Sequence, residues 1–433
     1  MLPWLPTHIR ALKQSLRLLR TPRFGTYYAA TLLSNIGAWS QQVAEPWLLI
    51  NLGASSFLIG LDSFAQSAPV WILILAGGML ADKADRRRVI TIFQAIQMMC
   101  PVALVALLLT HMVQPWMVVA LSLVVGITDA ISMPSFQTIA PSIVRHDQIA
   151  TAIALNATQF NLSRILGPAL AGILMTSVGV IGCFVANATS YLPFIAVALW
   201  ILPAGATPAR RDQSLDRHYL LLGLRRILAS AHMRDALITV LVASTLCGPL
   251  IIFCPVLVKD VLHGDSTQFS LAIGAFGIGG LFGSIALLGM DTDYDGRALC
   301  STSALAYGAL TTLAAISPWT WALPAILMLA GIAMAVSNTS ANSMLLAIAP
   351  ARLRGRTISL YMLAMRGGLS VGSLLAGVSA DIIGVRDTLL ICGLLAVAAH
   401  MVIGRRWMRA SPPDFSEKPH RRAAGTTSPA IHI

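Results

Sequence analysis

The chain has 433 residues, of which 56% are hydrophobic and only 11% are charged, whereas a soluble domain carries roughly 25% charged residues. The mean hydropathy is +0.74. The net charge of +12 is spread over short hydrophilic segments between apolar runs, which excludes a folded nucleic-acid-binding patch and indicates a polytopic membrane protein.

Residues 1–23 lack the continuous apolar core and the cleavage site of a signal peptide. Their apolar and basic side chains alternate with helical spacing, apolar at Ile9, Leu12, Leu16 and Leu19 and basic at Arg10, Lys13, Arg17 and Arg20. This pattern predicts an amphipathic helix on the cytoplasmic membrane surface. A disordered basic tail is the alternative.

Apolar segments long enough to cross a hydrocarbon core of roughly 30 Å recur along the chain. Twelve are expected, near residues 24–52, 56–80, 89–111, 115–140, 150–175, 179–202, 235–262, 266–290, 298–317, 320–348, 356–382 and 386–405. Of the 30 Lys and Arg residues, 26 fall in the termini and alternate loops on one side of this arrangement, against two on the other. The positive-inside rule then places both termini in the cytoplasm.

A hydrophilic linker at 203–234 divides the chain into two halves, 24–202 and 235–405, which are followed by a basic tail at 406–433. The halves share sequence in the same order. IAPSIVR (139–145) matches IAPARLR (348–354), and GPALAG (167–172) matches GSLLAG (372–377). These matches predict an all-α membrane protein of two pseudo-symmetric six-helix bundles, with a substrate site between them.

Two carboxylates stand in the outer parts of the first two spans, Glu45 and Asp62. Ionisable side chains inside a membrane are costly and indicate function, and either carboxylate can take up a proton from the outer face. For Asp62, a position near the water interface is the alternative.

Deeper in the membrane, Asp129 and Arg164 lie at similar depth on consecutive spans and can pair, either as a structural contact or as part of a proton or substrate pathway. Arg366 occupies a related position in the second half. Arg164 and Arg366 together can bind an anionic ligand; pairing near the cytoplasmic rim is the alternative for Arg366.

Polar side chains recur on one face of several spans, as expected for a cavity lining or for hydrogen bonds between helices. The candidate cavity residues are Asn35, Trp39, Gln42, Gln66, Asn187, Tyr191, Asn338 and Asn342.

The six cysteines all fall within apolar runs, which favours packing over disulfides or metal binding. The chain has neither GxxxxGK[ST] nor HExxH. We therefore expect no catalytic residues, no metal site and no cofactor.

Five segments carry a resemblance to a known family. They are SNIGAWSQQVAEPWLL (34–49), GGMLADKADRRR (77–88), ALNATQFNLSRILGPALAG (154–172), NATSYLPFI (187–195) and RLRGRTISLYM (352–362). Together they resemble the major facilitator superfamily of secondary transporters, and within it the enterobactin-exporter-like drug and siderophore effluxers. The resemblance covers residues 20–405. The chain departs from the pattern at Asp85, where the family has Gly, and around Asp129, where many members carry an Arg.

The resemblance implies roles for two motifs. The loop after the second span implies a gate, with Gly78, Asp82, Lys83, Arg86, Arg87 and Arg88 as its residues. Asp82 is expected to face the N-terminus of the eleventh span, where a helix dipole stabilises a carboxylate; a plain positive-inside anchor is the alternative. Gly167-Pro168 resembles the antiporter motif and is expected to act as a hinge.

Taken together, these features predict a proton-coupled exporter of an amphiphilic small molecule, such as a siderophore or a drug, and no enzyme. We expect it to work as a monomer in the lipid bilayer of the bacterial inner membrane, with no nucleic-acid partner. An importer or uniporter on the same fold is the alternative, and a membrane-embedded scaffold is a third.

Overall fold

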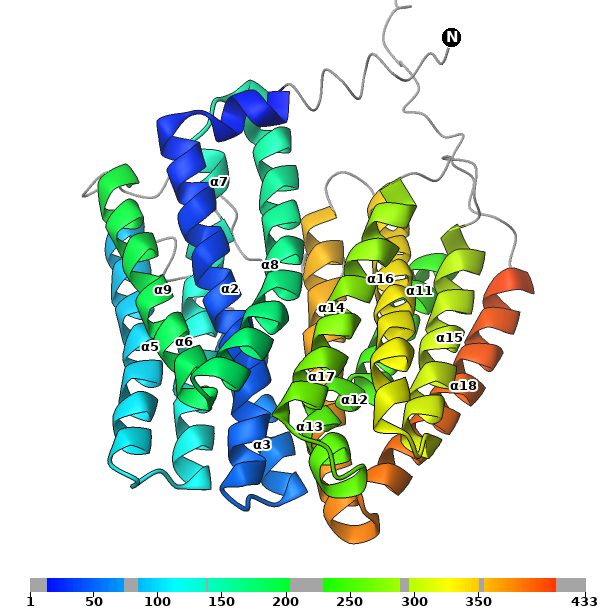
Figure 1. The fold of residues 1–433 in the computed structure, drawn as a ribbon. Coiled ribbons are helices and arrows are strands. Elements are labelled where there is room, and N and C mark those ends of the chain that lie inside the picture. Colours follow the sequence, from blue (N-terminus) through cyan, green and yellow to red (C-terminus); the bar gives the residue numbers. More distant parts are fainter. Residues whose placement is uncertain are drawn as a thin grey trace, which may run out of the picture.

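A computed structural model describes residues 14–73, 85–137, 139–202, 229–288, 296–349 and 354–409, and all their regular secondary structure is helical. The helices run side by side in two groups (Figure 1). The N-terminal half contains α2 (Pro22–Asn51), α3 (Ser56–Ser67), α5 (Arg86–Leu109), α6 (Pro115–Gln137), α7 (Ile139–Ser142), η1 (His146–Gln148), α8 (Ile149–Ser177) and α9 (Val180–Ile201). The C-terminal half contains α11 (Ala231–Val242), η2 (Ala243–Cys247), α12 (Pro249–Ile252), α13 (Cys254–Val256), η3 (Leu257–Val261), α14 (Ser266–Leu288), α15 (Gly296–Ile316), η4 (Thr320–Ala322), α16 (Leu323–Ile348), α17 (Arg354–Ile383) and α18 (Val385–Arg409).

Within these described ranges, nine helical stretches are long and apolar enough to cross a membrane. They comprise α5, α6, α9, α14, α15, α17 and α18 together with 231–252 and 320–348. The 30-residue α2 and the 29-residue α8 match them in length but carry more polar side chains. Where described, the helix bounds lie within a few residues of the segments expected from hydropathy.

The seventh expected span, 235–262, is helical but irregular. It is interrupted by two π-helical turns, η2 and η3, and by short segments that begin near Pro249 and Pro255. Proline has no backbone N–H and breaks the α-helical hydrogen-bond ladder. The Tyr307 hydroxyl of α15 donates to the Cys247 carbonyl oxygen at 3.1 Å, which satisfies a backbone acceptor at the irregular turn.

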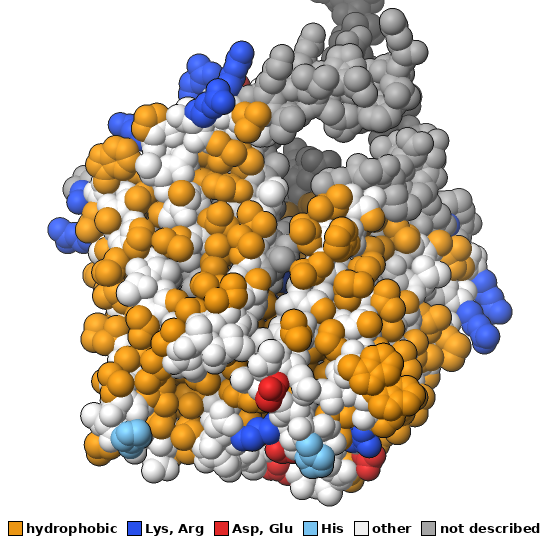
Figure 2. All heavy atoms as spheres, viewed as in Figure 1, with side chains coloured by type: hydrophobic (Ala, Val, Ile, Leu, Met, Phe, Trp, Pro, Cys, Tyr) orange, Lys and Arg blue, Asp and Glu red, His pale blue; other side chains and the backbone are white. Residues whose placement is uncertain are grey.

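The two ends of the bundle differ in charge. At the end where α2 begins, exposed arginines include Arg17, Arg20, Arg88 and Arg145, and we call this the basic end. At the opposite end, exposed carboxylates are Asp260, Asp265, Asp381 and Asp387. Figure 2 shows hydrophobic side chains over the flanks between these ends. Such a flank suits the acyl chains of a bilayer, because a charged side chain at that depth loses its hydration.

Tryptophans lie near both ends of the flanks. Trp116 and Trp321 are 61% and 77% exposed near the opposite end, and Trp200 is 62% exposed at the end of α9. Trp319 stacks on Trp321 with ring centroids 5.6 Å apart. Tryptophan prefers the interface between lipid and water, so these rings mark the two edges of the membrane-embedded zone.

The two halves meet closely toward the opposite end. Trp47 of α2 stacks on Phe269 of α14, with 5.1 Å between ring centroids, and Lys259 Nζ donates to Asn51 Oδ1 at 2.5 Å. Between α3 and α17 the backbones nearly touch, since a Cβ atom on Gly377 would lie only 3.2 Å from the Cα atom of Phe57. These contacts join the halves on that side.

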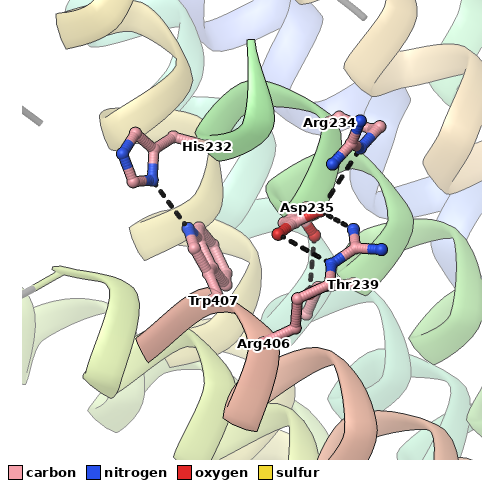
Figure 3. A network of polar contacts seen from close by, with 6 residues as sticks. All are labelled: His232, Arg234, Asp235, Thr239, Arg406 and Trp407. Atoms are coloured by element: carbon pink, nitrogen blue, oxygen red, sulfur yellow. Dashed lines mark hydrogen bonds and ion pairs between the residues drawn. The ribbon is translucent and has the colours of Figure 1, made fainter. Parts of the chain in front are cut away.

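A polar cluster near the basic end ties α11 to α18 (Figure 3). The Asp235 side chain is 2% exposed and forms an ion pair with Arg406. Its two carboxylate oxygens accept hydrogen bonds from the Arg406 guanidinium. Arg234 lies 3.5 Å from the same carboxylate. Beside it, the fully buried Trp407 donates from Nε1 to His232 Nδ1 at 3.2 Å. These contacts fix the first helix of the C-terminal half against its last.

Candidate functional site

Asp129, at the middle of α6, is held by glutamines of α5. Gln97 Nε2 donates to Asp129 Oδ1 at 2.7 Å, and Gln94 Nε2 donates to Gln97 Oε1 at 2.6 Å. Both glutamines are buried. The sequence interpretation in which Asp129 pairs with Arg164 is wrong in this structure, because Asp129 faces α5 within its own half.

A second polar chain joins α9, α2 and α3. Asn187 Nδ2 donates to Gln41 Oε1 at 2.6 Å, and Gln41 Nε2 donates to Glu45 Oε1 at 2.8 Å. Glu45 and Asp62 are 4% and 5% exposed. They lie close enough to interact electrostatically, and Asp62 lies beside Ser122 of α6.

Tyr191 of α9 lies between these two chains. It contacts the Asn187 side chain and is within electrostatic reach of both Asp129 and Glu45. We call the whole set the carboxylate line: Gln94, Gln97, Asp129, Tyr191, Asn187, Gln41, Glu45 and Asp62. It places three carboxylates inside the N-terminal half. They are the groups of this set that can take up a proton, and amide side chains hydrogen-bond to Asp129 and Glu45.

Arg164 of α8 lies elsewhere, at the junction of the two halves. Its guanidinium carbon is 5.4 Å from the centre of the Trp39 ring, a cation–π distance. Trp39 in turn packs edge-on against Phe160, with centroids 6.0 Å apart. From the other half, Tyr307 of α15 and Tyr361 of α17 lie within electrostatic reach of Arg164. The centre of the molecule therefore combines one cation with aromatic rings from both halves.

Gly167 brings α8 against α2 at this point. A side chain at Gly167 would overlap the Cβ atom of Trp39 and approach the Ile36 carbonyl oxygen at 3.2 Å. Pro168 follows within the helix. The Gly167-Pro168 pair therefore allows the close helix contact that places Trp39 over Arg164.

Other expected cavity residues have varied surroundings. Gln42 Nε2 donates to Gln66 Oε1 at 3.3 Å, which joins α2 to α3. The Asn338 carbonyl oxygen accepts from the Tyr361 hydroxyl at 3.3 Å. Asn35 is half-buried, and Asn342 Oδ1 is buried without a partner among the described residues. Asn187 and Tyr191, by contrast, belong to the carboxylate line inside the N-terminal half.

Arg366 of α17 is half-buried. It immediately precedes Gly367, and a Cβ atom on Gly367 would lie 2.8 Å from the Trp71 ring of the other half. This contact places Arg366 next to the junction of the two halves.

The expected gate loop falls largely outside the described residues, which include neither Gly78 nor Asp82 nor Lys83. Its end is described. Asp85 caps α5, because its Oδ1 accepts from the backbone N–H of Arg87 at 2.9 Å. This explains an aspartate where the family pattern has glycine. The helix opens with Arg86, and Arg88 is exposed.

Sequence reasoning missed several residues of the site. Gln41 stands four residues before Glu45, and Gln94 and Gln97 are three apart in an otherwise apolar span. That spacing on one helix face was the available signal. Tyr307 and Tyr361 carried none, because their place beside Arg164 depends on how the halves pack. Within the described residues, no group of three or more His, Cys, Asp or Glu side chains could hold a metal ion.

The helical fold and its intramembrane polar groups are those of a membrane transporter, and comparison with known proteins agrees. Residues 14–420 match the family described as transmembrane secretion effector. The chain therefore belongs to this family of major facilitator superfamily transporters, which confirms the resemblance seen in the sequence.

Three relatives show what related chains do. The chain is 25% identical over 387 residues to the staphyloferrin A transporter of Staphylococcus aureus, covering 87% of this chain and 94% of that protein. It is 27% identical to the multidrug efflux pump Tap of Mycolicibacterium fortuitum, covering 84% and 91% of the two chains. It is 24% identical to the enterobactin exporter EntS of Escherichia coli, covering 93% and 97%.

Solved structures share the fold. The nucleoside transporter NupG superposes with a TM-score of 0.74 at 13% identity, covering 90% of this chain and 100% of that one. A bacterial homologue of the iron transporter ferroportin gives 0.65 at 14% identity, covering 89% and 98%. At these identities the likeness describes the fold alone.

Proposed function

We propose that the protein is a proton-driven exporter that moves an amphiphilic small molecule, a siderophore or a drug, out of the cytoplasm by alternating access. We further propose twelve spans, both termini in the cytoplasm, and action as a monomer in the bacterial inner membrane. The relatives named for siderophore export and drug efflux support the direction of transport.

One observation carries the coupling part of this proposal. The carboxylate line is buried inside the N-terminal half, while Arg164 lies at the junction between halves. Helix α2 contributes to both the carboxylate line and the surroundings of Arg164. Its Trp39 contacts Arg164, and its Glu45, six residues further along, accepts the last hydrogen bond of the chain that begins at Asn187. Protonation of Glu45 changes the charge on α2, and the position of α2 sets the position of Trp39. Protonation of Glu45 and binding of a substrate beside Arg164 therefore affect each other through the position of α2.

The two halves of the molecule are the parts that move between the two states of the transport cycle. Contacts between α3 and α17 and between α2 and α14 close the opposite end. Alternating access requires these contacts to break while others form at the basic end. The gate loop with Asp82 and Arg86 is proposed as the contact that forms there, against the N-terminus of α17.

The test measures proton movement in everted membrane vesicles, with a pH-sensitive dye and a panel of siderophores and lipophilic cations. We expect one class of compound to release the quenched dye. Asp129→Asn is expected to abolish the release, and Gln41→Leu to reduce it strongly, because each interrupts the carboxylate line. Asp265→Asn, at the exposed opposite end, is the matched control and should behave as the unaltered protein.

The outcomes separate the alternatives. Export of a compound without proton movement would remove the coupling proposal and favour facilitated diffusion or another ion. Accumulation of a labelled compound by intact cells would favour an importer. A scaffold would tolerate both Asp129→Asn and Arg164→Gln without loss of function.

A further inference from the structure

Among the described residues, Arg164 has no opposite charge to balance it. Among the described residues it forms neither an ion pair nor a conventional hydrogen bond; its close contact is the Trp39 ring. The carboxylates in the interior of the described spans have other neighbours, and Asp381 and Asp387 are exposed at the opposite end. Asp129 accepts from Gln97, Glu45 accepts from Gln41 and faces Asp62, and Asp235 pairs with Arg406.

A lone charge at this depth is unfavourable. Arg164 lies at the middle of the 29-residue α8, remote from both ends of the helix. Arg164 is half-buried, and a cation that is withdrawn even partly from water loses hydration unless an anion or strong acceptors replace the water. An anionic ligand would supply the negative charge that the described residues do not provide, and its binding would stabilise the arginine at this position.

The geometry leaves Arg164 ready to bind an anion. The guanidinium carbon lies over the Trp39 ring, and a cation–π contact of this kind does not use up the N–H groups at the edge of the guanidinium. That edge can donate two parallel hydrogen bonds to a carboxylate, phenolate or sulfonate.

The surrounding rings favour a flat apolar body next to that anion. Trp39 and Phe160 form an aromatic wall. Tyr307 and Tyr361 reach toward Arg164 from the other half, but their hydroxyls donate to the backbone carbonyls of Cys247 and Asn338. The two tyrosines therefore offer their aromatic rings to a ligand, while the guanidinium of Arg164 offers the hydrogen-bond donors.

We infer that Arg164 is the substrate's anion-binding residue, and that the transported molecule is an amphiphilic anion with a planar apolar part. This inference rests on the proposed function and narrows it, because it selects amphiphilic anions over lipophilic cations as the substrate class. The anion enters beside Trp39, bridges the halves and neutralises the only charge that α8 places at the junction in the described residues.

The test compares two dyes with the same xanthene skeleton and opposite charge, anionic fluorescein and cationic rhodamine 123. The full-length protein is placed in nanodiscs of uncharged lipid, with no proton gradient, and binding is followed by fluorescence anisotropy. We expect fluorescein to bind at least about tenfold more tightly than rhodamine 123, since hydrogen bonds to charged groups are worth that much in affinity.

Variants locate the effect. Arg164→Gln is expected to weaken fluorescein binding by about ten- to a hundredfold and to leave rhodamine 123 binding nearly unchanged. Arg164→Lys should keep part of the affinity, because the charge remains but the bidentate edge is lost. Arg405→Gln removes the same charge from an exposed position on α18 and should leave fluorescein binding unchanged.

Three results would overturn the inference: equal or tighter binding of rhodamine 123, no binding of fluorescein, or full fluorescein affinity in Arg164→Gln. The comparison of the two dyes on the unaltered protein stands even if a variant does not fold. The assay uses no gradient, so loss of proton coupling in vesicles would leave this result intact. If the dye-binding experiment gave one of these three results while proton movement in vesicles was still observed, the anion-binding inference would be wrong but the proposed exporter function would stand.

Discussion

Gly167 is the residue that lets α8 lie directly on α2. We expect Gly167→Ala to lower stability by roughly 1–3 kcal/mol, as overpacking of a tight contact does, since its Cβ atom would overlap that of Trp39. Transport should fall as well, because Trp39 moves away from Arg164. Thermal unfolding in detergent and vesicle transport measure the two effects.

Gly274 of α14 provides the matched control for this change. A Cβ atom there would meet no atom within 4 Å. Gly274→Ala should therefore keep both stability and transport, and alanine also favours the helix. Equal behaviour of the two variants would show that the contact of Gly167 with Trp39 has no role.

At the scale of single residues, the sequence identified the ionisable groups but not their partners. Glu45, Asp62, Asp129 and Arg164 all lie inside helices of the membrane-embedded zone, as hydropathy predicts. Asp129 and Arg164 share a depth, which suggested a pair, yet depth says nothing of the direction in which a side chain points. Rotation of α6 toward α5 turns Asp129 to Gln97 instead.

At the scale of helices, the contact of α11 with α18 is stabilised by an asymmetric ion pair. Asp235 has a side chain that is 2% exposed, whereas that of Arg406 is 53% exposed. Removing the arginine leaves a buried carboxylate whose remaining ion-pair partner among the described residues is Arg234, but removing the carboxylate leaves an arginine that water can solvate.

We therefore expect Arg406→Gln to lower the melting temperature more than Asp235→Asn does. Unfolding of the purified protein in one detergent measures both. Arg409→Gln, at the exposed end of α18, is the control and should have little effect. The reverse order of the two melting temperatures would show that the buried carboxylate is satisfied without Arg406.

Helix bounds were predicted well where composition alone decides them. An apolar run must be helical in lipid, because its backbone groups have no water to bind. At the seventh expected span, residues 235–262, a stretch at 231–252 is long and apolar enough to cross a membrane, but two π-helical turns interrupt the regular helix. Hydropathy does not register the loss of backbone donors at Pro249 and Pro255, which the sequence does contain.

At the scale of the whole molecule, the close contact of α3 with α17 near the opposite end predicts that a disulfide there would hold the two halves together. Phe57→Cys combined with Gly377→Cys should form a disulfide on oxidation, since a Cβ atom on Gly377 lies 3.2 Å from Phe57 Cα. Transport should stop because the halves can no longer separate there. Reduction should restore it, as measured by vesicle transport before and after addition of a thiol.

Each single cysteine variant serves as a control, and its transport should be the same before and after oxidation. The native cysteines are buried or half-buried and unpaired, so they offer little competition. Full transport with the disulfide demonstrably formed would contradict an alternating-access movement at this junction.

The sequence by itself determined the membrane class, the approximate spans and the family, because these follow from hydropathy, charge distribution and motifs along the chain; it also predicts that the two halves are related. Only the tertiary structure decided which polar groups meet. It forms the carboxylate line inside one half, and it places Arg164 between aromatic rings of both halves with no counter-ion in the part of the chain that is described. Those contacts join residues far apart in sequence, and they depend on the rotation and packing of whole helices, which local composition does not encode.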